Sequence, residues 1–246
     1  MHEVLVRGHS LPAVYHDALL SLCVMGDEVP CPDYNTSQKE CSMTMVISHP
    51  LKEPMISRLF IGGAQDLEQY CQEMLDGILD FEVDRGNWNY TYHQRYADQY
   101  QFIIDELTRN PHSRRAVMDI RTKDDMYSDD PACWQHVQYF IRNGELCCKI
   151  LFRSNDAVKA TFMNAFALIM LQKKIADELD IPIGSCTYRA NSFHVYEKDY
   201  PLLDGYVNRI QSGKDTTYNY VGDWDIQMAD SREAIKEKVE TLRGVK

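Results

Sequence analysis

The sequence lacks any run of apolar residues long enough to cross a bilayer as a helix. Its opening stretch, MHEVLVRGHSLPAVYH, also lacks the apolar core of a secretory signal peptide. Positive charge is scarce: 26 Lys and Arg stand against 37 Asp and Glu, for a net charge of -11. Without a basic stripe nothing would neutralise a phosphate backbone, so we expect a cytoplasmic protein with no nucleic-acid and no membrane partner. A local cluster of arginines could still bind a small anion.

The eight cysteines form no C-x-x-C pair and no Cys/His spacing that suits zinc. In a cytosolic chain they are expected to be free thiols, and we expect no metal site. Cys147 and Cys148 are neighbours in an expected strand, so their side chains should point to opposite faces and serve most simply as core fillers. Cys133 differs in its neighbours, because it follows Pro131 and precedes an expected hairpin.

The chain has no repeat and no clear linker. With 246 residues, 44% of them hydrophobic, it can bury one sizeable core, and we expect a single domain over residues 1–246. Apolar residues at helical spacing predict helices over residues 14–25, 64–78, 97–110, 159–179 and 230–244. Strands are expected over residues 41–50, 114–120, 136–153 and 184–199, and a polar loop over residues 26–40.

Three of these elements carry more detailed expectations. Asn143-Gly144 suits a type I′ turn, which makes residues 136–153 a β-hairpin. The helix over 159–179 is apolar on most faces and should lie at the centre of the core. Asp230 and Glu233 are spaced for a capping box at the start of the last helix. Strands that outnumber crossover helices, with one buried helix, indicate an α+β fold.

Several residues are candidates for chemistry. A cysteine becomes a strong nucleophile when nearby positive charge favours its thiolate, and Arg114, Arg115 and Arg153 could supply that charge to Cys133. Arg153-Ser154 offers the planar fork and the hydroxyl that suit a phosphate monoester. The remaining candidates are Asn164, which could read the amide-like edge of a uracil ring, and His194 and Tyr196, which could hold a sugar hydroxyl.

Each candidate also has a structural interpretation. A cysteine near a proline before a strand is most often structural, and Arg153 could pair with any of many acidic side chains. A buried asparagine in a helix often only forms hydrogen bonds with the backbone groups of a neighbouring strand. Composition and spacing alone therefore do not establish an enzyme.

Four motifs taken together, in order, change this. They are NPHSRR, PACWQHVQYFIRNGEL, FRSNDAVKATFMNA and SFHVY. Over about residues 88–204 the chain resembles the thymidylate synthases and the pyrimidine nucleotide hydroxymethylases that share their fold, most of all the compact, archaeal-type thymidylate synthases. The resemblance implies a mixed sheet with a buried central helix and a homodimer formed through the sheet.

The resemblance also implies roles for individual residues. Cys133 would attack C6 of the pyrimidine, Arg153 and Ser154 would hold the nucleotide phosphate, and Arg114 and Arg115 would reach that phosphate from the partner subunit. The other implied contacts are Asp156 with the pterin of methylenetetrahydrofolate, His194 and Tyr196 with the deoxyribose 3′-hydroxyl, Tyr92 as an active-site tyrosine, and Asn164 with the base. Glu73 is the candidate for the carboxylate that relays protons, although an exposed helical glutamate is an equal alternative.

The choice of reaction stays open between two related ones. Cytosine-specific hydroxymethylases typically have aspartate at the position of Asn164, so the asparagine favours dUMP. We expect a thymidylate synthase that yields dTMP and dihydrofolate. A dUMP or dCMP hydroxymethylase, in which water captures the methylene group, is the alternative. A non-catalytic nucleotide-binding homologue or a plain structural protein remains as a further hypothesis.

Three departures from the family pattern bear on this choice. Trp134 stands where many members have histidine after the nucleophile. The segment CPDYNTSQKECS has no phosphate-binding arginine, and Lys39 could replace only its charge. The tail that closes over folate is absent or replaced by KVETLRGVK, and loss of closure would admit water and favour hydroxymethylation.

Overall fold

The structure, a computed structural model, describes residues 1–244. At its centre is one seven-stranded sheet with the strand order β1-β3-β8-β7-β6-β5, in which β2 pairs with the first part of β3. β1 is parallel to β3 and β7 is parallel to β8, whereas the other neighbours are antiparallel. The strands are β1 (Glu3–Gly8), β2 (Asp27–Cys31), β3 (Thr36–Ile47), β5 (Val117–Asp119), β6 (Trp134–Arg142), β7 (Glu145–Asp156) and β8 (Ile183–Tyr196). A small second sheet joins β4 (Ile56–Ser57) to β9 (Thr217–Tyr218). The mixed sheet predicted from the sequence is confirmed.

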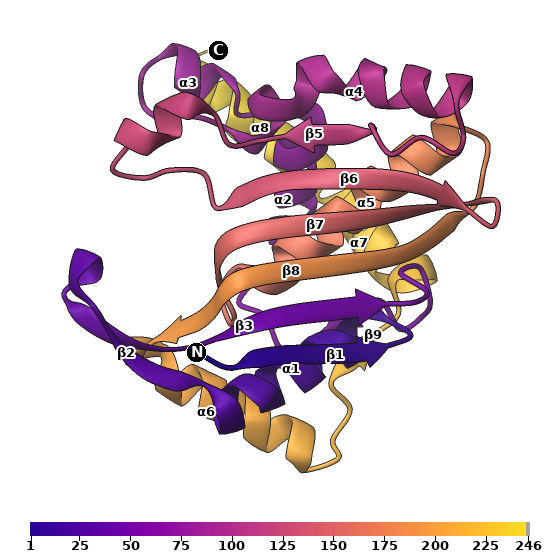
Figure 1. Ribbon diagram of the computed structural model, residues 1–246. Coiled ribbons are helices and arrows are strands. Elements are labelled where there is room, and N and C mark those ends of the chain that lie inside the picture. The colour runs from indigo at the N-terminus through magenta and orange to yellow at the C-terminus, as the bar shows by residue number, and fades with distance from the viewer. Residues whose placement is uncertain (245–246) are drawn as a thin grey trace.

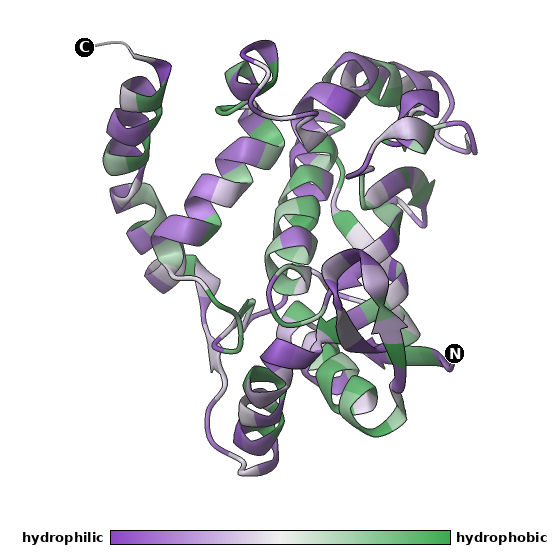
Figure 2. Ribbon diagram, turned by 90° about the vertical axis from the view of Figure 1, so that its left-hand side faces the viewer, coloured by the Kyte–Doolittle hydropathy of each residue, from purple (hydrophilic) through white to green (hydrophobic). Residues whose placement is uncertain are grey.

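The helices lie behind this sheet or along its edges in Figure 1, and its front face is uncovered. They are α1 (Leu11–Met25), α2 (Ala64–Asp76), α3 (Phe81–Asp84), α4 (Tyr92–Arg109), α5 (Thr161–Glu178), α6 (Tyr200–Gln211), α7 (Asp225–Asp230) and α8 (Arg232–Arg243). In Figure 2 the helix that leads to the C-terminus lies on the opposite side of the view from the N-terminus. Within residues 1–244 no helix is both long and apolar enough to cross a membrane.

α5 is the buried central helix, as predicted. Phe162, Phe166 and Ile169 are almost fully buried, so apolar side chains fill several of its faces. Gln172 is also buried, and its amide nitrogen donates hydrogen bonds to the Leu146 carbonyl at 2.6 Å and the Gly184 carbonyl at 3.2 Å. A polar side chain can lie in this core because its amide is paired with the ends of two strands.

The β6–β7 hairpin is confirmed, including its turn. Asn143 and Gly144 have φ angles of 55° and 80°, which are both positive, as a type I′ turn requires. The hairpin carries the chain from Cys133, just before β6, back to Arg153 near the end of β7. Since β6 and β7 are antiparallel, these two residues meet, and the Arg153 amide donates to the Cys133 carbonyl at 2.8 Å.

The expected loop over residues 26–40 is wrong. Most of this segment forms β2 and the start of β3, an antiparallel arm whose tip is a 3-10 turn over Pro32–Tyr34. Asn35 ends that turn in the left-handed region with φ 50°. The arm's side chains are partly solvated, so the segment lacks the apolar alternation by which a half-buried strand is recognised.

The expected capping box at residues 230 and 233 is also wrong. α8 begins at Arg232, directly after α7, and its N-cap residue Ser231 has helical dihedrals and makes no side-chain cap. The backbone amide of Ser231 instead bonds back to the Gln227 and Met228 carbonyls. A helix that follows another without a break has no exposed first turn for a capping box to satisfy.

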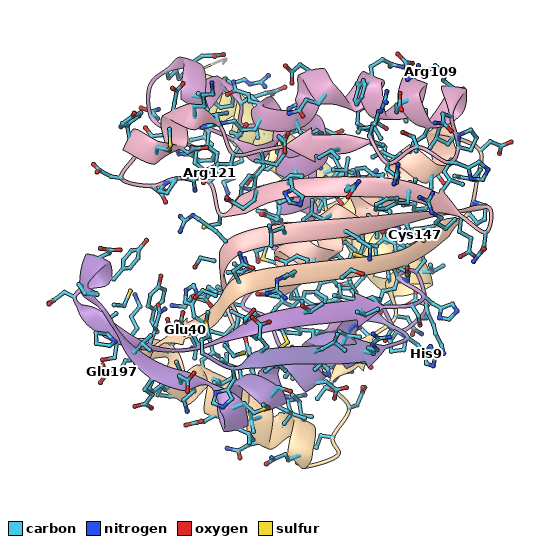
Figure 3. All side chains as sticks on the ribbon, viewed as in Figure 1. His9, Glu40, Arg109, Arg121, Cys147 and Glu197 are labelled. Atoms are coloured by element: carbon cyan, nitrogen blue, oxygen red, sulfur yellow. The ribbon has the colours of Figure 1, made fainter. Side chains whose placement is uncertain are left out.

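The front face of the sheet is open to solvent over β1, β7 and β8. Leu5 is 54% exposed there, and Cys147 is half-buried on the same face, where Figure 3 labels it. Cys148 points the other way, and its thiol donates to the side-chain oxygen of Gln172 at 3.1 Å. The opposite orientation of the two cysteines is confirmed, but Cys147 is not a core filler.

Candidate active site

The candidate residues meet at one end of the sheet, where β6 begins and β7 and β8 end. Cys133 immediately precedes β6, whereas Arg153 and Ser154 lie near the end of β7 and His194 near the end of β8. Because β7 and β8 are parallel, both strands deliver their final residues to the same edge, with Asp156 paired to His194. Residues that are far apart in the sequence thus form one cluster.

The Cys133 thiol is half-buried beside a guanidinium group. Burial raises the pKa of Cys133, the positive charge of Arg153 lowers it, and Asp130 raises it further. Arg153 donates from Nε to the Ala132 carbonyl at 3.2 Å and from Nη2 to the Pro131 carbonyl at 2.6 Å. The arginine therefore fixes the two residues immediately before the thiol, and its remaining N–H groups can still serve a ligand.

His194 brings an unpaired polar atom to this cluster. The residue is only 4% exposed, and Nδ1 lies 3.3 Å from the Ser154 hydroxyl, while Nε2 has no partner within residues 1–244. Burial lowers the pKa of His194, and the nearby Asp156 carboxylate raises it in part. Tyr196 packs against the imidazole edge to face, with ring centroids 4.9 Å apart. A neutral ring with an unsatisfied buried nitrogen is suited to a hydroxyl ligand.

Asn164 reaches the cluster from α5. It is 5% exposed, and its Oδ1 accepts a hydrogen bond from the hydroxyl of Tyr70 on α2. Burial is the main cause of the raised pKa of Tyr70, and a charge on Cys133 adds to it, so the two side chains lie in the same region. Sequence reasoning missed Tyr70, because no local pattern pairs a residue on α2 with one on α5.

Trp134 is fully buried next to the nucleophile. Its ring packs edge to face against Tyr92 and Tyr96, with centroids 5.6 and 5.9 Å apart, and its Nε1 donates to the His136 carbonyl at 3.1 Å. The Tyr92 hydroxyl accepts from the Trp134 amide at 3.4 Å. Tyr92 is thus held beside the cysteine loop, and the indole is a packing element with its N–H already paired.

A cavity of about 420 Å³ opens beside these residues. Its wall includes Tyr70, Glu73, Trp88, Tyr90 and Tyr92. Four of the eleven lining residues are aromatic and two, Glu73 and Asp130, carry carboxylates. Aromatic faces beside polar groups suit a flat heteroaromatic ring.

Glu73 lies in the wall of this cavity and is half-buried, not fully exposed. Burial raises its pKa, whereas the amide of Gln69, which donates to Glu73 at 2.7 Å, and the charge of Lys238 lower it. The Lys238 ammonium on α8 donates to the Gln69 side-chain oxygen at 2.8 Å. Gln69 therefore links the last helix to the carboxylate, a connection that the sequence did not indicate.

Asp156 lies outside the cavity, at the end of β7. One of its oxygens accepts from the backbone amides of Val158 and Lys159, at 3.0 and 2.8 Å, in the turn that leads into α5. It lies beside His194 and does not line the cavity that contains Glu73. Among residues 1–244 the structure shows no hydrogen bond to its second oxygen.

The structure does not bring Arg114 and Arg115 to Cys133 within one chain. They precede β5, and the Gln138 amide donates to the Arg114 carbonyl at 2.9 Å. At about 3.3 Å per residue, Gln138 lies roughly 17 Å along β6 from Cys133. Both arginines are exposed and line a surface depression with Arg109 and Ser113.

Lys39 does not extend freely toward the cluster. Its ammonium lies 5.6 Å from the centre of the Tyr200 ring, in a cation–π contact at the base of the β2–β3 arm. Within residues 1–244, no three His, Cys, Asp or Glu side chains converge as metal ligands.

Comparison with known proteins gives consistent matches. Residues 69–228 match the family model described as thymidylate synthase. The chain is 30% identical to a putative thymidylate synthase of Methanocaldococcus jannaschii, over 82% of this chain and 95% of that protein. It is 32% identical to a putative thymidylate synthase of Methanothermobacter thermautotrophicus, over 57% of this chain and 64% of that one. Its fold resembles thermostable thymidylate synthase A from Bacillus subtilis, with a TM-score of 0.66 and 15% identity over 81% of this chain and 84% of that chain.

Proposed function

The chain belongs to the thymidylate synthase family, and from this we propose that it transfers a one-carbon unit from methylenetetrahydrofolate to C5 of dUMP, giving dTMP and dihydrofolate. The observation that carries this proposal is the gathering of a thiol, a guanidinium and a buried amide at one end of the sheet, from Cys133, Arg153 and Asn164. These are the three chemical groups that covalent attack on a pyrimidine nucleotide requires.

In this mechanism Cys133 attacks C6 of the ring, forming an S–C6 bond. The electrons of the C5–C6 double bond move toward C5 and the C4 carbonyl, so that negative charge develops on the carbonyl oxygen. Asn164 would stabilise that charge by donating from its side-chain amide. Arg153 favours the thiolate that begins the attack, because its charge opposes the effect of burial on the pKa of Cys133. The S–C6 bond breaks at the end of the cycle and returns the thiol.

The nucleotide's phosphate and sugar would supply the binding energy that orients the ring. Arg153 and Ser154 would bind the phosphate through charge-assisted hydrogen bonds. The unpaired Nε2 of His194, with Tyr196 beside it, would bind the 3′-hydroxyl of the deoxyribose. Such remote contacts hold C6 in reach of the thiol.

The aromatic cavity fits the second substrate. Methylenetetrahydrofolate supplies both the one-carbon unit and the reducing hydride when bound. Trp88 and Tyr90 would stack on part of this substrate. Asp156 lies outside the cavity beside His194, so it would accept hydrogen bonds from the edge of the pterin that reaches toward the nucleotide. Glu73 would relay protons between the cavity and the pyrimidine. Burial raises its pKa, and a carboxyl group with a raised pKa both takes up and releases a proton more readily near neutral pH.

Two copies of the chain would pair through the open face of the sheet. That face carries exposed apolar and half-buried side chains, including Leu5 and Cys147, and no helix within residues 1–244 covers it. In such a homodimer Arg114 and Arg115, which do not reach Cys133 in their own chain, would bind the phosphate in the partner's site. Each site would then be incomplete in a single subunit.

A second reaction, hydroxymethylation of dUMP or dCMP, is favoured by the position of α8. This helix packs along α2, where Arg232 pairs with Glu68 at 2.7 Å, and none of its described residues lines the cavity. A cavity that this segment does not close would admit water to the exocyclic methylene group.

The test is identification of the product. The protein is incubated with methylenetetrahydrofolate and equal amounts of dUMP and dCMP, dihydrofolate absorbance is followed, and the nucleotides are identified by mass spectrometry. We expect dTMP in equal amount to dihydrofolate and no modified dCMP. A hydroxymethylated nucleotide without dihydrofolate would replace the proposal by the second reaction, and unchanged nucleotides would reject both.

The pH dependence of turnover tests the role of Glu73. A proton relay that needs the ionised carboxylate loses activity as the pH falls through its pKa, which burial raises. Gln69→Leu removes a hydrogen bond that lowers this pKa, so the acid limb of the kcat profile should move to higher pH. The matched control is Gln101→Leu, which removes the same kind of contact, Gln101 to Asp105 at 2.9 Å, from α4. An acid limb that stays in place in Gln69→Leu, or moves equally in both variants, would remove Glu73 from the relay.

A further inference from the structure

Tyr70 is placed where it can control how Asn164 meets a ligand. Its hydroxyl donates to Oδ1 of Asn164, which joins α2 to α5 across 94 residues of sequence. Tyr70 also lines the aromatic cavity, and it lies in the same region as Cys133. It is therefore in contact with the base-reading amide and close to the nucleophile at once.

In the structure the Tyr70 hydroxyl is the donor and Oδ1 of Asn164 is the acceptor. Burial, and after it the Glu73 carboxylate, raises the pKa of Tyr70, so the phenol keeps its proton throughout the neutral range. An amide carbonyl oxygen accepts and its NH₂ donates, and the two groups diverge from one carbon. With the hydroxyl bonded to Oδ1, the NH₂ group of Asn164 points away from Tyr70.

The NH₂ group is the part of Asn164 left for a ligand. Among residues 1–244, Nδ2 of Asn164 has no hydrogen-bond partner, and it is not among the fully enclosed unpaired atoms. A donor presented to the base matches the C4 carbonyl of uracil. It does not match the C4 amino group of cytosine. There two N–H donors would face each other, and both would be desolvated without gaining a hydrogen bond.

We propose that Tyr70 is a positioning residue that fixes the Asn164 amide with its NH₂ toward the base and thereby selects a uracil over a cytosine nucleotide. This inference rests on the proposed function, in which Asn164 contacts the pyrimidine. Selectivity for the base then depends on a pair of residues from two helices. Without Tyr70, the amide can rotate and offer its oxygen to a cytosine amino group.

The experiment compares kcat/KM for dUMP and for dCMP in wild-type protein and in Tyr70→Phe. Loss of one hydrogen bond should lower the ratio of dUMP to dCMP about tenfold. Binding of each nucleotide alone, measured by calorimetry, should show the same shift. Tyr70→His keeps a ring with an N–H donor and should retain more of the preference than Tyr70→Phe.

The matched control is Tyr100→Phe. The Tyr100 hydroxyl also donates to a side-chain oxygen on α5, that of Glu178 at 2.8 Å. Glu178 lies roughly 20 Å along the helix from Asn164, at about 1.5 Å per residue. Tyr100→Phe should therefore cost similar stability and leave the base preference unchanged.

Two outcomes would overturn the inference, and they separate it from the proposed function. If wild-type protein prefers dUMP and Tyr70→Phe keeps the same ratio in both assays, Tyr70 does not position Asn164, although the proposed function stands. If wild-type protein neither binds nor converts dUMP or dCMP, the proposed function fails and the inference fails with it. A ratio of dUMP to dCMP that falls equally in Tyr70→Phe and in the control Tyr100→Phe would also reject the inference.

Discussion

Cys133→Ala is expected to abolish turnover while leaving nucleotide binding intact. Loss of a covalent nucleophile typically costs at least about 10⁴-fold in kcat, because no neighbouring group can form the bond in its place. The contacts proposed to hold the nucleotide come from Arg153, Ser154 and His194, and Arg153 is anchored to backbone carbonyls that this substitution leaves unchanged. The measurements are dihydrofolate formation for turnover and calorimetry for dUMP binding.

The control for this variant is Cys23→Ala, which removes a half-buried thiol from α1, far from the site in sequence. It should keep wild-type turnover. Alkylation with iodoacetamide gives a second readout: Cys133 should be modified in free protein and protected by dUMP. Full activity in Cys133→Ala would show the covalent mechanism to be wrong. Nucleotide binding without any turnover in the wild-type protein would instead indicate a non-catalytic homologue.

The elements predicted correctly from the sequence are those whose pattern is local. The apolar run of α5 predicts a helix that is buried on several faces, and Asn143-Gly144 predicts a turn with two positive φ angles. Each of these features depends only on neighbouring residues and backbone preferences. The order of four motifs then indicated the fold as a whole.

The elements missed depend on contacts between distant segments. The β2–β3 arm is held by pairing between two partly solvated strands, which leaves no apolar period to detect. The contact of Tyr70 with Asn164 and that of Lys238 with Gln69 join helices that are 94 and 169 residues apart. Periodicity shows which face of a helix is buried, but not which partner it meets.

Trp134 illustrates a residue whose role the sequence left open. Many members of the family have histidine at this position, so a tryptophan there left open which hydrogen bonds form near the nucleophile. In the structure the indole is buried among Tyr92 and Tyr96, and its N–H is paired with a backbone carbonyl. The position is therefore filled by packing, and in the proposed function the polar contact with the base comes from Asn164, whose Oδ1 is bonded to Tyr70.

Mixing two inactive variants should restore activity if the proposed homodimer shares its sites. Arg153→Ala should weaken dUMP binding by about 2–3 kcal/mol, since it removes charge-assisted hydrogen bonds. The double variant Arg114→Ala/Arg115→Ala should lose activity because it removes the arginines that bind the phosphate in the partner's site. When Cys133→Ala subunits exchange with Arg114→Ala/Arg115→Ala subunits, one site of each hybrid dimer has its own Cys133 and Arg153 and receives intact arginines from the partner. Random exchange in equal amounts makes half of the dimers hybrid with one good site each, so about a quarter of wild-type activity should return.

The control mixture decides which residues act across the interface. Cys133→Ala mixed with Arg153→Ala should stay inactive, because Cys133 and Arg153 lie in the same chain's site, joined by the bond from the Arg153 amide to the Cys133 carbonyl. Recovery in the first mixture and not in the second assigns Arg114 and Arg115 to the partner's site, in agreement with their distance from Cys133 along β6. Failure of both mixtures, with subunit exchange verified by mass spectrometry, would place these arginines outside the shared site, and the phosphate would then depend on Arg153 and Ser154 alone.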